Sequence, residues 1–315
     1  MNITVLDAAT LGDDITFEVW QALGNLTVYQ TTQPKDIIPR LKNTDIAILN
    51  KVKITKEIIN SLSDLKLICV TATGFDNIDT AACKEKGIAV CNVKGYSTHS
   101  VAQVTVTLAL ALMTHLPEYA KYVRQGKYTA SGVQNCLTPV FHELYGKTWG
   151  IVGLGNIGKQ VAKVATAFGC RVIGYKRTPD SEYETADLET VLRQSDIVSL
   201  HLPLTDQTKE IINKNTLSLM KSNAILINVA RGAVTNEQDI ATAIKNGTIA
   251  GFGSDVYSFE PMPSNSPFIS ISEMPNVILT PHMAWGAYES RVRCVNEIAQ
   301  NIKSFISGDN RNRIV

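Results

Sequence analysis

The sequence predicts an α/β protein built from two doubly wound domains, each with a parallel sheet. Short apolar runs alternate with helix-like stretches in both halves, which favours strand-helix-strand units and parallel strands. The length of 315 residues is greater than one typical domain and suits two. A G-x-G-x-x-G motif at 153–158 stands between a strand-like run and an amphipathic run. This is the pattern of a dinucleotide-binding turn.

Residues 1 to about 95 read as one small α/β domain. Its expected helices lie near 14–23, 35–42, 56–62 and 78–86, between strands joined by short links. The expected strands are 3–6, 26–29, 46–49, 67–70 and 88–91.

The link at 71–77 is the most informative in this half, because it leaves the carboxyl end of a strand. Ligands of open α/β sheets sit at that edge. The small residues Ala72, Thr73 and Gly74 leave backbone N–H groups that could meet an anion. A plain strand-to-helix turn is the alternative.

Residues 100–126 are too continuously apolar for a surface helix, which predicts a buried helix linking the two domains. The stretch 127–146 has little periodicity and reads as an arm or long loop, a kind of segment that often forms an interface.

A second series of strands starts at Lys147, and six strands are expected, at 147–152, 171–174, 197–200, 224–228, 249–253 and 277–279. A final helix at 289–306 is expected to return to the first domain. The predicted division is therefore 1–99 with 288–315 for one domain, and 100–287 for the other.

The composition of the chain excludes several classes of binding partner. Lys and Arg total 30 against 29 Asp and Glu, so the net charge of +1 gives no reason to expect nucleic acid or an anionic membrane surface as a partner. The first residues lack a signal-peptide pattern, and no apolar run reaches the ~18 residues of a membrane span. We expect a cytoplasmic protein. Six scattered cysteines without C-x-x-C or histidine partners predict reduced thiols and no metal site.

The three glycines of the motif have distinct expected roles. Gly153 permits the tight turn, Gly155 lets the backbone approach a pyrophosphate, and Gly158 lets the helix pack on the strand.

Polar residues follow several strands of the second series, and parallel strands bring their carboxyl ends to one edge. Arg231, Glu260 and His282 are therefore expected on the face that holds the dinucleotide.

These three side chains suit hydride transfer to a 2-oxo acid or from a 2-hydroxy acid. Arg231 offers a planar fork for the carboxylate. His282 can be the acid-base group, and Glu260 can bond its other ring nitrogen. Each also has a structural alternative: a surface ion pair, a solvated Glu-Pro turn, and a packed histidine. His201 also ends a strand, but the residues after it look like a lid over the cofactor.

Taken together, the motifs resemble the D-isomer-specific 2-hydroxyacid dehydrogenase family over nearly the whole chain. The matching segments are 71–79, 101–103, 153–158, 228–232, Asp255-Val256 with Glu260-Pro261, and 281–285. The resemblance implies a flavodoxin-like substrate domain, a Rossmann dinucleotide-binding domain, and a homodimer built around 100–146.

The same resemblance implies roles by position. Arg231, Glu260 and His282 would be catalytic. Substrate contacts are implied at Ala72, Thr73, Gly74, Arg231, His282 and Trp285. Cofactor contacts are implied at Thr73, Gly153, Gly155, Asn156, Ile157, Gly158, Lys176, Arg177, His201, Leu202, Pro203, Thr208, Val229, Ala230, Asp255 and Ala284.

Within the family, 92–98 and 282–285 are most similar to the glycerate dehydrogenase (hydroxypyruvate reductase) branch, although His99 stands where that branch commonly has an acid. Hydroxypyruvate/D-glycerate or glyoxylate is the expected substrate, with D-lactate or an amino-acid-derived 2-oxo acid as alternatives. A cofactor-sensing interaction protein of the corepressor type is the alternative from another class.

The residues after the expected strand at 171–174 bear on the choice between NADP(H) and NAD(H). Lys176, Arg177 and Thr178 begin 18 residues after Gly158, where NAD-specific sites usually carry an acid. We expect NADP(H) to be favoured over NAD(H); a relaxed site that takes both is the alternative.

Overall fold

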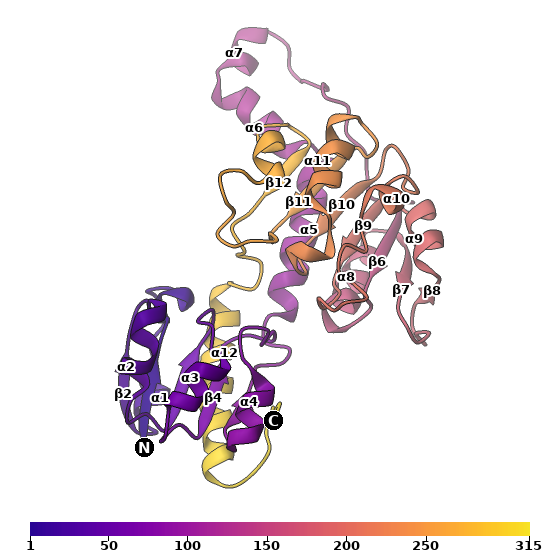
Figure 1. Cartoon of the computed structure of the whole chain (residues 1–315). Helices are drawn as coiled ribbons and strands as arrows, with labels where there is room; N and C mark the ends of the chain where they lie inside the picture. The colour runs from indigo at the N-terminus through magenta and orange to yellow at the C-terminus, as the bar shows by residue number, and fades with distance from the viewer. The chain divides into compact units, whose positions relative to one another are not determined.

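The computed structural model describes residues 1–315 and divides into two compact units (Figure 1). Unit 1 comprises Met1–Ser97 and Gly286–Val315, and unit 2 comprises Thr98–Trp285. The chain thus passes from one unit to the other after residues 97 and 285, where the sequence predicts breaks after 99 and 287.

Unit 1 contains a five-stranded parallel sheet in the order β2-β1-β3-β4-β5, the flavodoxin-like order. Strands β3 and β4 are buried along their whole length, which explains their unbroken apolar sequences. The strands are β1 (Asn2–Val5), β2 (Asn25–Val28), β3 (Ile46–Leu49), β4 (Leu67–Val70) and β5 (Ala89–Cys91). The helices are α1 (Glu18–Gln21), α2 (Ile37–Leu41), α3 (Lys56–Ser61), α4 (Thr80–Lys86) and α12 (Tyr288–Ile306), with 3₁₀ turns η1 (Ala8–Leu11) and η2 (Pro34–Asp36).

The last helix, α12, belongs to unit 1 although it follows unit 2 in the sequence. The indole of Trp20 is fully buried and donates a hydrogen bond to the carbonyl of Val295 at 2.9 Å, so α1 is tied to α12. The final residues pair with the edge of the sheet through an isolated antiparallel bridge between Cys91 and Arg313. Ile314 donates to the carbonyl of Val90 at 2.7 Å, because edge strand β5 leaves its backbone groups free on that side.

Unit 2 contains a seven-stranded parallel sheet in the order β12-β11-β10-β9-β6-β7-β8. The sequence predicts six strands and misses β8 (Glu184–Thr185), a polar edge strand of two residues that pairs with β7. With β8 in place the sheet has the Rossmann order 3-2-1-4-5-6, extended by one strand. The others are β6 (Thr148–Val152), β7 (Arg171–Tyr175), β9 (Ile197–Leu200), β10 (Ile225–Asn228), β11 (Gly251–Ser254) and β12 (Val277–Leu279).

Helices cover both faces of this sheet, since successive strand residues point to opposite sides. Ile225 and Ile227 of β10 pack in the core shared with α5 and α8, and Leu226 packs in the core on the other face. The helices are α5 (Thr98–Met113), α8 (Asn156–Ala167), α9 (Leu188–Gln194), α10 (Lys214–Leu217) and α11 (Glu237–Lys245), with 3₁₀ turns η3 (Gly232–Val234) and η4 (Pro267–Ile271).

The apolar stretch predicted as one helix over 100–126 is two helices. Helix α5 ends at Met113, and α6 (Leu116–Arg124) starts after His115, whose φ is +51°. Pro117 in the first turn of α6 cannot continue the preceding helix, because it lacks the N–H that such a helix needs. The expected arm contains the short helix α7 (Lys127–Ser131). No single helix is both long and apolar enough to cross a membrane; α5 and α6 together pass by length and composition only, and they are bent by 64° at their break.

Candidate active site

The glycine turn between β6 and α8 has the geometry expected for holding a pyrophosphate. Gly153 has a φ of +107°, which favours glycine. A Cβ on Gly158 would lie 2.1 Å from the carbonyl oxygen of Gly153, so only glycine allows the helix to pack this closely. A Cβ on Gly155 would meet nothing within 4 Å. Open space therefore lies beside the first turn of α8, whose N–H groups suit an anion, and a dinucleotide fits this turn.

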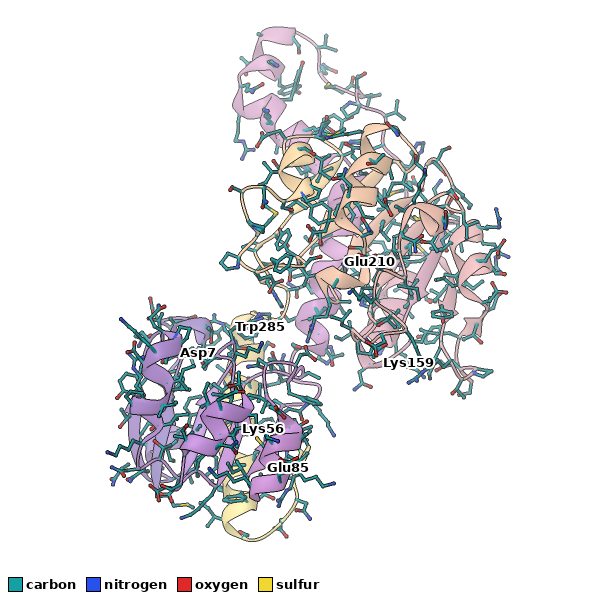
Figure 2. All side chains as sticks on the ribbon, viewed as in Figure 1. Asp7, Lys56, Glu85, Lys159, Glu210 and Trp285 are labelled. Atoms are coloured by element: carbon teal, nitrogen blue, oxygen red, sulfur yellow. The ribbon has the colours of Figure 1, made fainter.

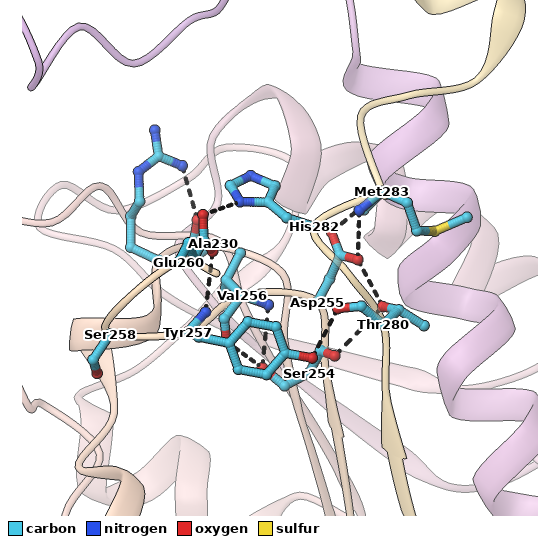
Figure 3. Close-up of polar contacts among 12 residues, drawn as sticks. Ala230, Ser254, Asp255, Val256, Tyr257, Ser258, Glu260, Thr280, His282 and Met283 are labelled. Carbon is cyan, nitrogen blue, oxygen red and sulfur yellow. Dashed lines mark hydrogen bonds and ion pairs between the residues drawn. The ribbon is translucent and has the colours of Figure 1, made fainter. Parts of the chain in front are cut away.

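His282 and Glu260 form the central polar pair of unit 2 (Figure 3). The Nδ1 atom of His282 lies 2.6 Å from Oε2 of Glu260. The second carboxylate oxygen accepts a hydrogen bond from the backbone N–H of Tyr257 at 3.1 Å, which orients the carboxylate. The histidine side chain is 23% exposed, and its Nε2 has no hydrogen bond within the chain. One ring nitrogen is thus held by a carboxylate and the other is free to meet a ligand.

Asp255 holds the loop that carries His282. Its carboxylate accepts hydrogen bonds from the backbone N–H groups of Met283 and Ala284, both at 2.8 Å, and from the hydroxyl of Thr280 at 2.6 Å. Only 1% of the residue is exposed, and burial raises the pKa of this carboxyl above its usual value. Asp255 therefore joins the end of β11 to the end of β12, and its implied contact with the cofactor stays a prediction.

Arg231 lies in a turn that follows β10 and is held by Asn228. The side chain of Asn228 donates to the carbonyl of Arg231 and accepts from the N–H of Ala230, each at 3.0 Å. Gly232 packs so tightly that a Cβ would lie 1.9 Å from the carbonyl carbon of Tyr257. The Arg231 turn is thus in direct contact with the 255–260 segment. One guanidinium nitrogen of Arg231 donates to the carbonyl of Ala230 at 2.9 Å.

His201 is a poor acid-base group in this structure. Its Nε2 lies 3.0 Å from the hydroxyl of Ser199, which also receives the indole N–H of Trp149, and its buried Nδ1 has no partner. Burial lowers the pKa of His201 from 6.5 to about 3, so the ring stays neutral at ordinary pH. Between the two strand-end histidines, only His282 has a carboxylate beside it.

The other implied cofactor residues lie around the same sheet edge. Val229, Ala230 and Ala284 are buried, while Leu202 packs partly on the core, and Asn156 and Ile157 open α8. The hydroxyl of Thr208 donates to the carbonyl of Pro203 at 2.6 Å, which closes the loop after His201. Lys176 and Arg177 follow β7, and Lys176 forms an ion pair with Asp180 at 2.9 Å.

The 71–77 link lies in unit 1, at the carboxyl end of β4. Its carbonyl groups are held by the 92–93 segment: the side chain of Asn92 donates to Thr73 at 2.7 Å, and the N–H of Val93 donates to Ala72 at 3.0 Å. The N–H groups of Ala72, Thr73 and Gly74 make no hydrogen bond within the chain. Trp285 is the last residue of unit 2 and is partly exposed.

Sequence reasoning did not single out three residues that position the site: Asn228, Thr280 and Tyr257. Tyr257 donates its hydroxyl to the carbonyl of Thr280 at 2.9 Å, and burial raises its pKa to about 12. Each of the three stands at the end of an apolar strand or just beyond it. A small polar residue at the end of a buried run would have been the signal for Asn228 and Thr280, whereas Tyr257, three residues beyond β11, had no such signal.

The comparisons with known proteins agree with this geometry. Residues 106–284 match the family model described as D-isomer specific 2-hydroxyacid dehydrogenase, NAD binding domain. The chain belongs to this family. It is therefore an oxidoreductase that uses a nicotinamide cofactor and acts on a 2-hydroxy or 2-oxo acid.

Two curated relatives and one solved structure illustrate the likeness. The chain is 39% identical to the glycerate dehydrogenase of Methylorubrum extorquens, over 90% of each chain. It is 34% identical to the hydroxypyruvate reductase of Blautia hydrogenotrophica, over 98% of each. An acyclic imino acid reductase, solved with NADPH and D-Arg, superposes with a TM-score of 0.89 at 32% identity, covering 100% of both chains. None of the three is named as an interaction protein, so the corepressor-type alternative gains no support.

Proposed function

We propose that this dehydrogenase reduces hydroxypyruvate or glyoxylate, and that Arg231, Glu260 and His282 are its catalytic residues. The observation that carries the assignment of these roles is the 2.6 Å contact between Nδ1 of His282 and the carboxylate of Glu260, beside the Arg231 turn. The relatives named glycerate dehydrogenase and hydroxypyruvate reductase support the choice of a small substrate.

In this proposal His282 is the proton donor for reduction. The bound reduced cofactor supplies a hydride to the carbonyl carbon. Nε2 of His282 gives a proton to the carbonyl oxygen, which becomes the hydroxyl group, and the reverse transfer accompanies oxidation. Glu260 lies against the other ring nitrogen, Nδ1, and keeps the ring in its orientation.

The substrate carboxylate is assigned to two groups of donors. Arg231 offers a guanidinium that matches a carboxylate. The N–H groups of Ala72, Thr73 and Gly74, which have no acceptor in the chain, offer a second cradle, and Trp285 an apolar contact. On this assignment 1–99 with 288–315 is the substrate domain and 100–287 the dinucleotide-binding domain.

For the cofactor we propose a preference for NADP(H). Lys176 and Arg177 directly follow β7, the second strand of the Rossmann order, where the adenosine ribose is bound in this fold. Two cations at this place suit a 2′-phosphate, and neither 176 nor 177 is an acid. Thr73, His201, Leu202, Pro203 and Thr208 are assigned to the remaining contacts of the cofactor.

We also propose a homodimer built on the arm and helices α6 and α7. This region concentrates large apolar side chains on the surface, among them Leu137 at 67% and Val140 at 69% exposed. Exposed apolar patches on this scale mark interaction sites. The others are Leu116, Val123, Val133, Phe141 and Tyr145. We place the protein in the cytoplasm, where its six unpaired cysteines would stay reduced.

Substrate choice is measured by following reduced nicotinamide absorbance with a panel of 2-oxo acids. We expect hydroxypyruvate and glyoxylate to give the highest kcat/KM, with pyruvate and bulkier acids lower, and D-glycerate to be the product on chiral chromatography. A strong preference for bulky acids would show that the proposed substrate is wrong.

The roles of His282 and Glu260 separate in a pair of variants. We expect His282→Ala to lower kcat by about 10²–10⁴-fold, because the general acid is lost, while the cofactor still binds. Glu260→Gln should lower kcat by a smaller factor than His282→Ala, because the amide oxygen can still accept from Nδ1 and hold the ring while the carboxylate charge is lost. His99→Ala, at an exposed position of α5, is the control. An active His282→Ala enzyme would identify a different acid.

The cofactor preference is tested by comparing kcat/KM for NADPH and NADH. We expect NADPH to be favoured, and the double variant Lys176→Ala, Arg177→Ala to lose about tenfold or more with NADPH alone, as two charge-assisted contacts disappear. Lys163→Ala, an exposed lysine further along α8, should change neither value. A wild-type preference for NADH would contradict the proposal.

The homodimer is tested by light scattering during gel filtration. We expect a mass of about twice the 34.4 kDa of the chain, and the double variant Leu137→Asp, Val140→Asp to elute as a monomer, because charges would be buried in the interface. Ile38→Asp, at an exposed position of α2, is the matched control and should remain dimeric. A monomeric wild type would refute the dimer.

A further inference from the structure

An ion cluster centred on Asp180 lies between the first turn of α8 and the loop after β7. Lys159 is the fourth residue of α8, and Lys176 directly follows β7. The same oxygen, Oδ2 of Asp180, lies 2.9 Å from the ammonium nitrogen of each lysine. Figure 2 labels Lys159 on the side of unit 2 that carries α8 and β7. One carboxylate thus neutralises two cations that border the cofactor turn.

Asp180 is also hydrogen-bonded within its own loop. The second oxygen of its carboxylate accepts the backbone N–H of Glu182 at 3.0 Å, which folds the 176–182 loop inward. Only 2% of the Asp180 side chain is exposed, against 37% for Lys159 and 36% for Lys176. The two ion pairs hold the pKa of the Asp180 carboxyl well below its usual range, so it is ionised at any working pH.

The position of this cluster coincides with the assigned place of the 2′-phosphate. In the Rossmann order the ribose of the adenosine meets the end of the second strand, and the pyrophosphate meets the first turn of the first helix. Lys176 stands at the former and Lys159 near the latter. The Asp180 carboxylate, which both lysines share, therefore lies at the place that the 2′-phosphate of a bound cofactor would have to enter.

We propose that Asp180 competes with the 2′-phosphate of NADPH for Lys159 and Lys176, and so limits how strongly the protein prefers NADPH. This rests on the proposed cofactor preference. When NADPH binds, the phosphate takes over both lysines and the Asp180 carboxylate moves out to solvent. NADH brings no such anion and leaves the cluster as it is. Lys159 thereby becomes a third specificity residue beside Lys176 and Arg177.

A different role for Asp180 makes the opposite prediction. Asp180 lies 22 residues after Gly158, close to the spacing of acids that bond ribose hydroxyls in NAD-specific sites. If Asp180 bonded the ribose, removing its charge would weaken the binding of NADH. If Asp180 competes with the phosphate, removing its charge strengthens the binding of NADPH. The two readings are separated by binding alone, without turnover.

The test measures dissociation constants of NADPH and NADH from nicotinamide fluorescence, using the full chain without substrate. Asp180→Asn keeps an oxygen to accept the N–H of Glu182 while removing the charge. We expect it to lower the dissociation constant of NADPH by roughly three- to tenfold, which is the contribution of two partly exposed ion pairs. The dissociation constant of NADH should not change. Lys159→Gln should weaken NADPH and not NADH.

The matched control is Glu182→Gln in the same loop. Glu182 is 61% exposed and lies 3.6 Å from Lys159, so this variant removes one negative charge without freeing the lysines from Asp180. We expect it to leave both constants nearly unchanged. In Asp180→Asn with Lys176→Ala, the gain in NADPH affinity should shrink.

Two results would overturn the competition. One is an unchanged or weaker NADPH constant in a folded Asp180→Asn protein, and the other is a weakened NADH constant. A wild type that prefers NADH, yet gains NADPH affinity in Asp180→Asn, would refute the proposed cofactor preference and keep the role of Asp180. Competition by adenosine 2′,5′-bisphosphate against AMP gives the same comparison, because the two differ in the 2′-phosphate.

Discussion

The buried carboxylate of Asp255 joins the ends of two strands and so determines where His282 stands. Its two oxygens take the N–H groups of Met283 and Ala284 and the hydroxyl of Thr280, so the turn around His282 has little freedom. A buried carboxylate is stable only when it is well bonded, and these three donors satisfy it. The imidazole reaches Glu260 because the loop beneath it is held in this way.

The parallel arrangement of the strands positions the other loops of the site. All pairings in the sheet of unit 2 are parallel, so the segments after β6, β9, β10, β11 and β12 emerge at one edge. The glycine turn, the His201 loop, the Arg231 turn and the Asp255 loop are consequently neighbours, although 102 residues separate Gly153 from Asp255 in the chain. Asn228 and Gly232 then set the fine contact, since a larger side chain than glycine could not pack against Tyr257.

The lysines beside the cofactor turn are already paired with a carboxylate of the protein. The lysine at the end of β7 is already paired with Asp180, as is the lysine on α8. A basic residue in the sequence is therefore not by itself a free anion site, because the folded protein supplies its own anion. On the proposal made for Asp180, the preference between the two nicotinamide cofactors depends on two competing anions and not on a count of positive charges.

The sequence by itself determined the alternation of strands and helices, because burial on both faces of a parallel sheet demands unbroken apolar runs such as Ile46–Leu49 and Leu67–Val70. It also predicted the glycine turn, since the φ of Gly153 and the packing of Gly158 tolerate only glycine at little cost. The two-residue strand β8 escaped prediction because it is short and polar, whereas the break at His115 had a local signal in Pro117 that the continuous apolar pattern outweighed.

Only the tertiary structure decided which polar residues meet. Arg231, Glu260 and His282 were identified from the sequence as strand-end residues, but the 2.6 Å contact of the last two depends on a loop held by Asp255. The pairing of Asp180 with Lys159, 21 residues away, depends on how α8 packs beside β7. A sequence records which side chains are present, whereas their charges are balanced by neighbours that only the folded chain brings within hydrogen-bonding distance.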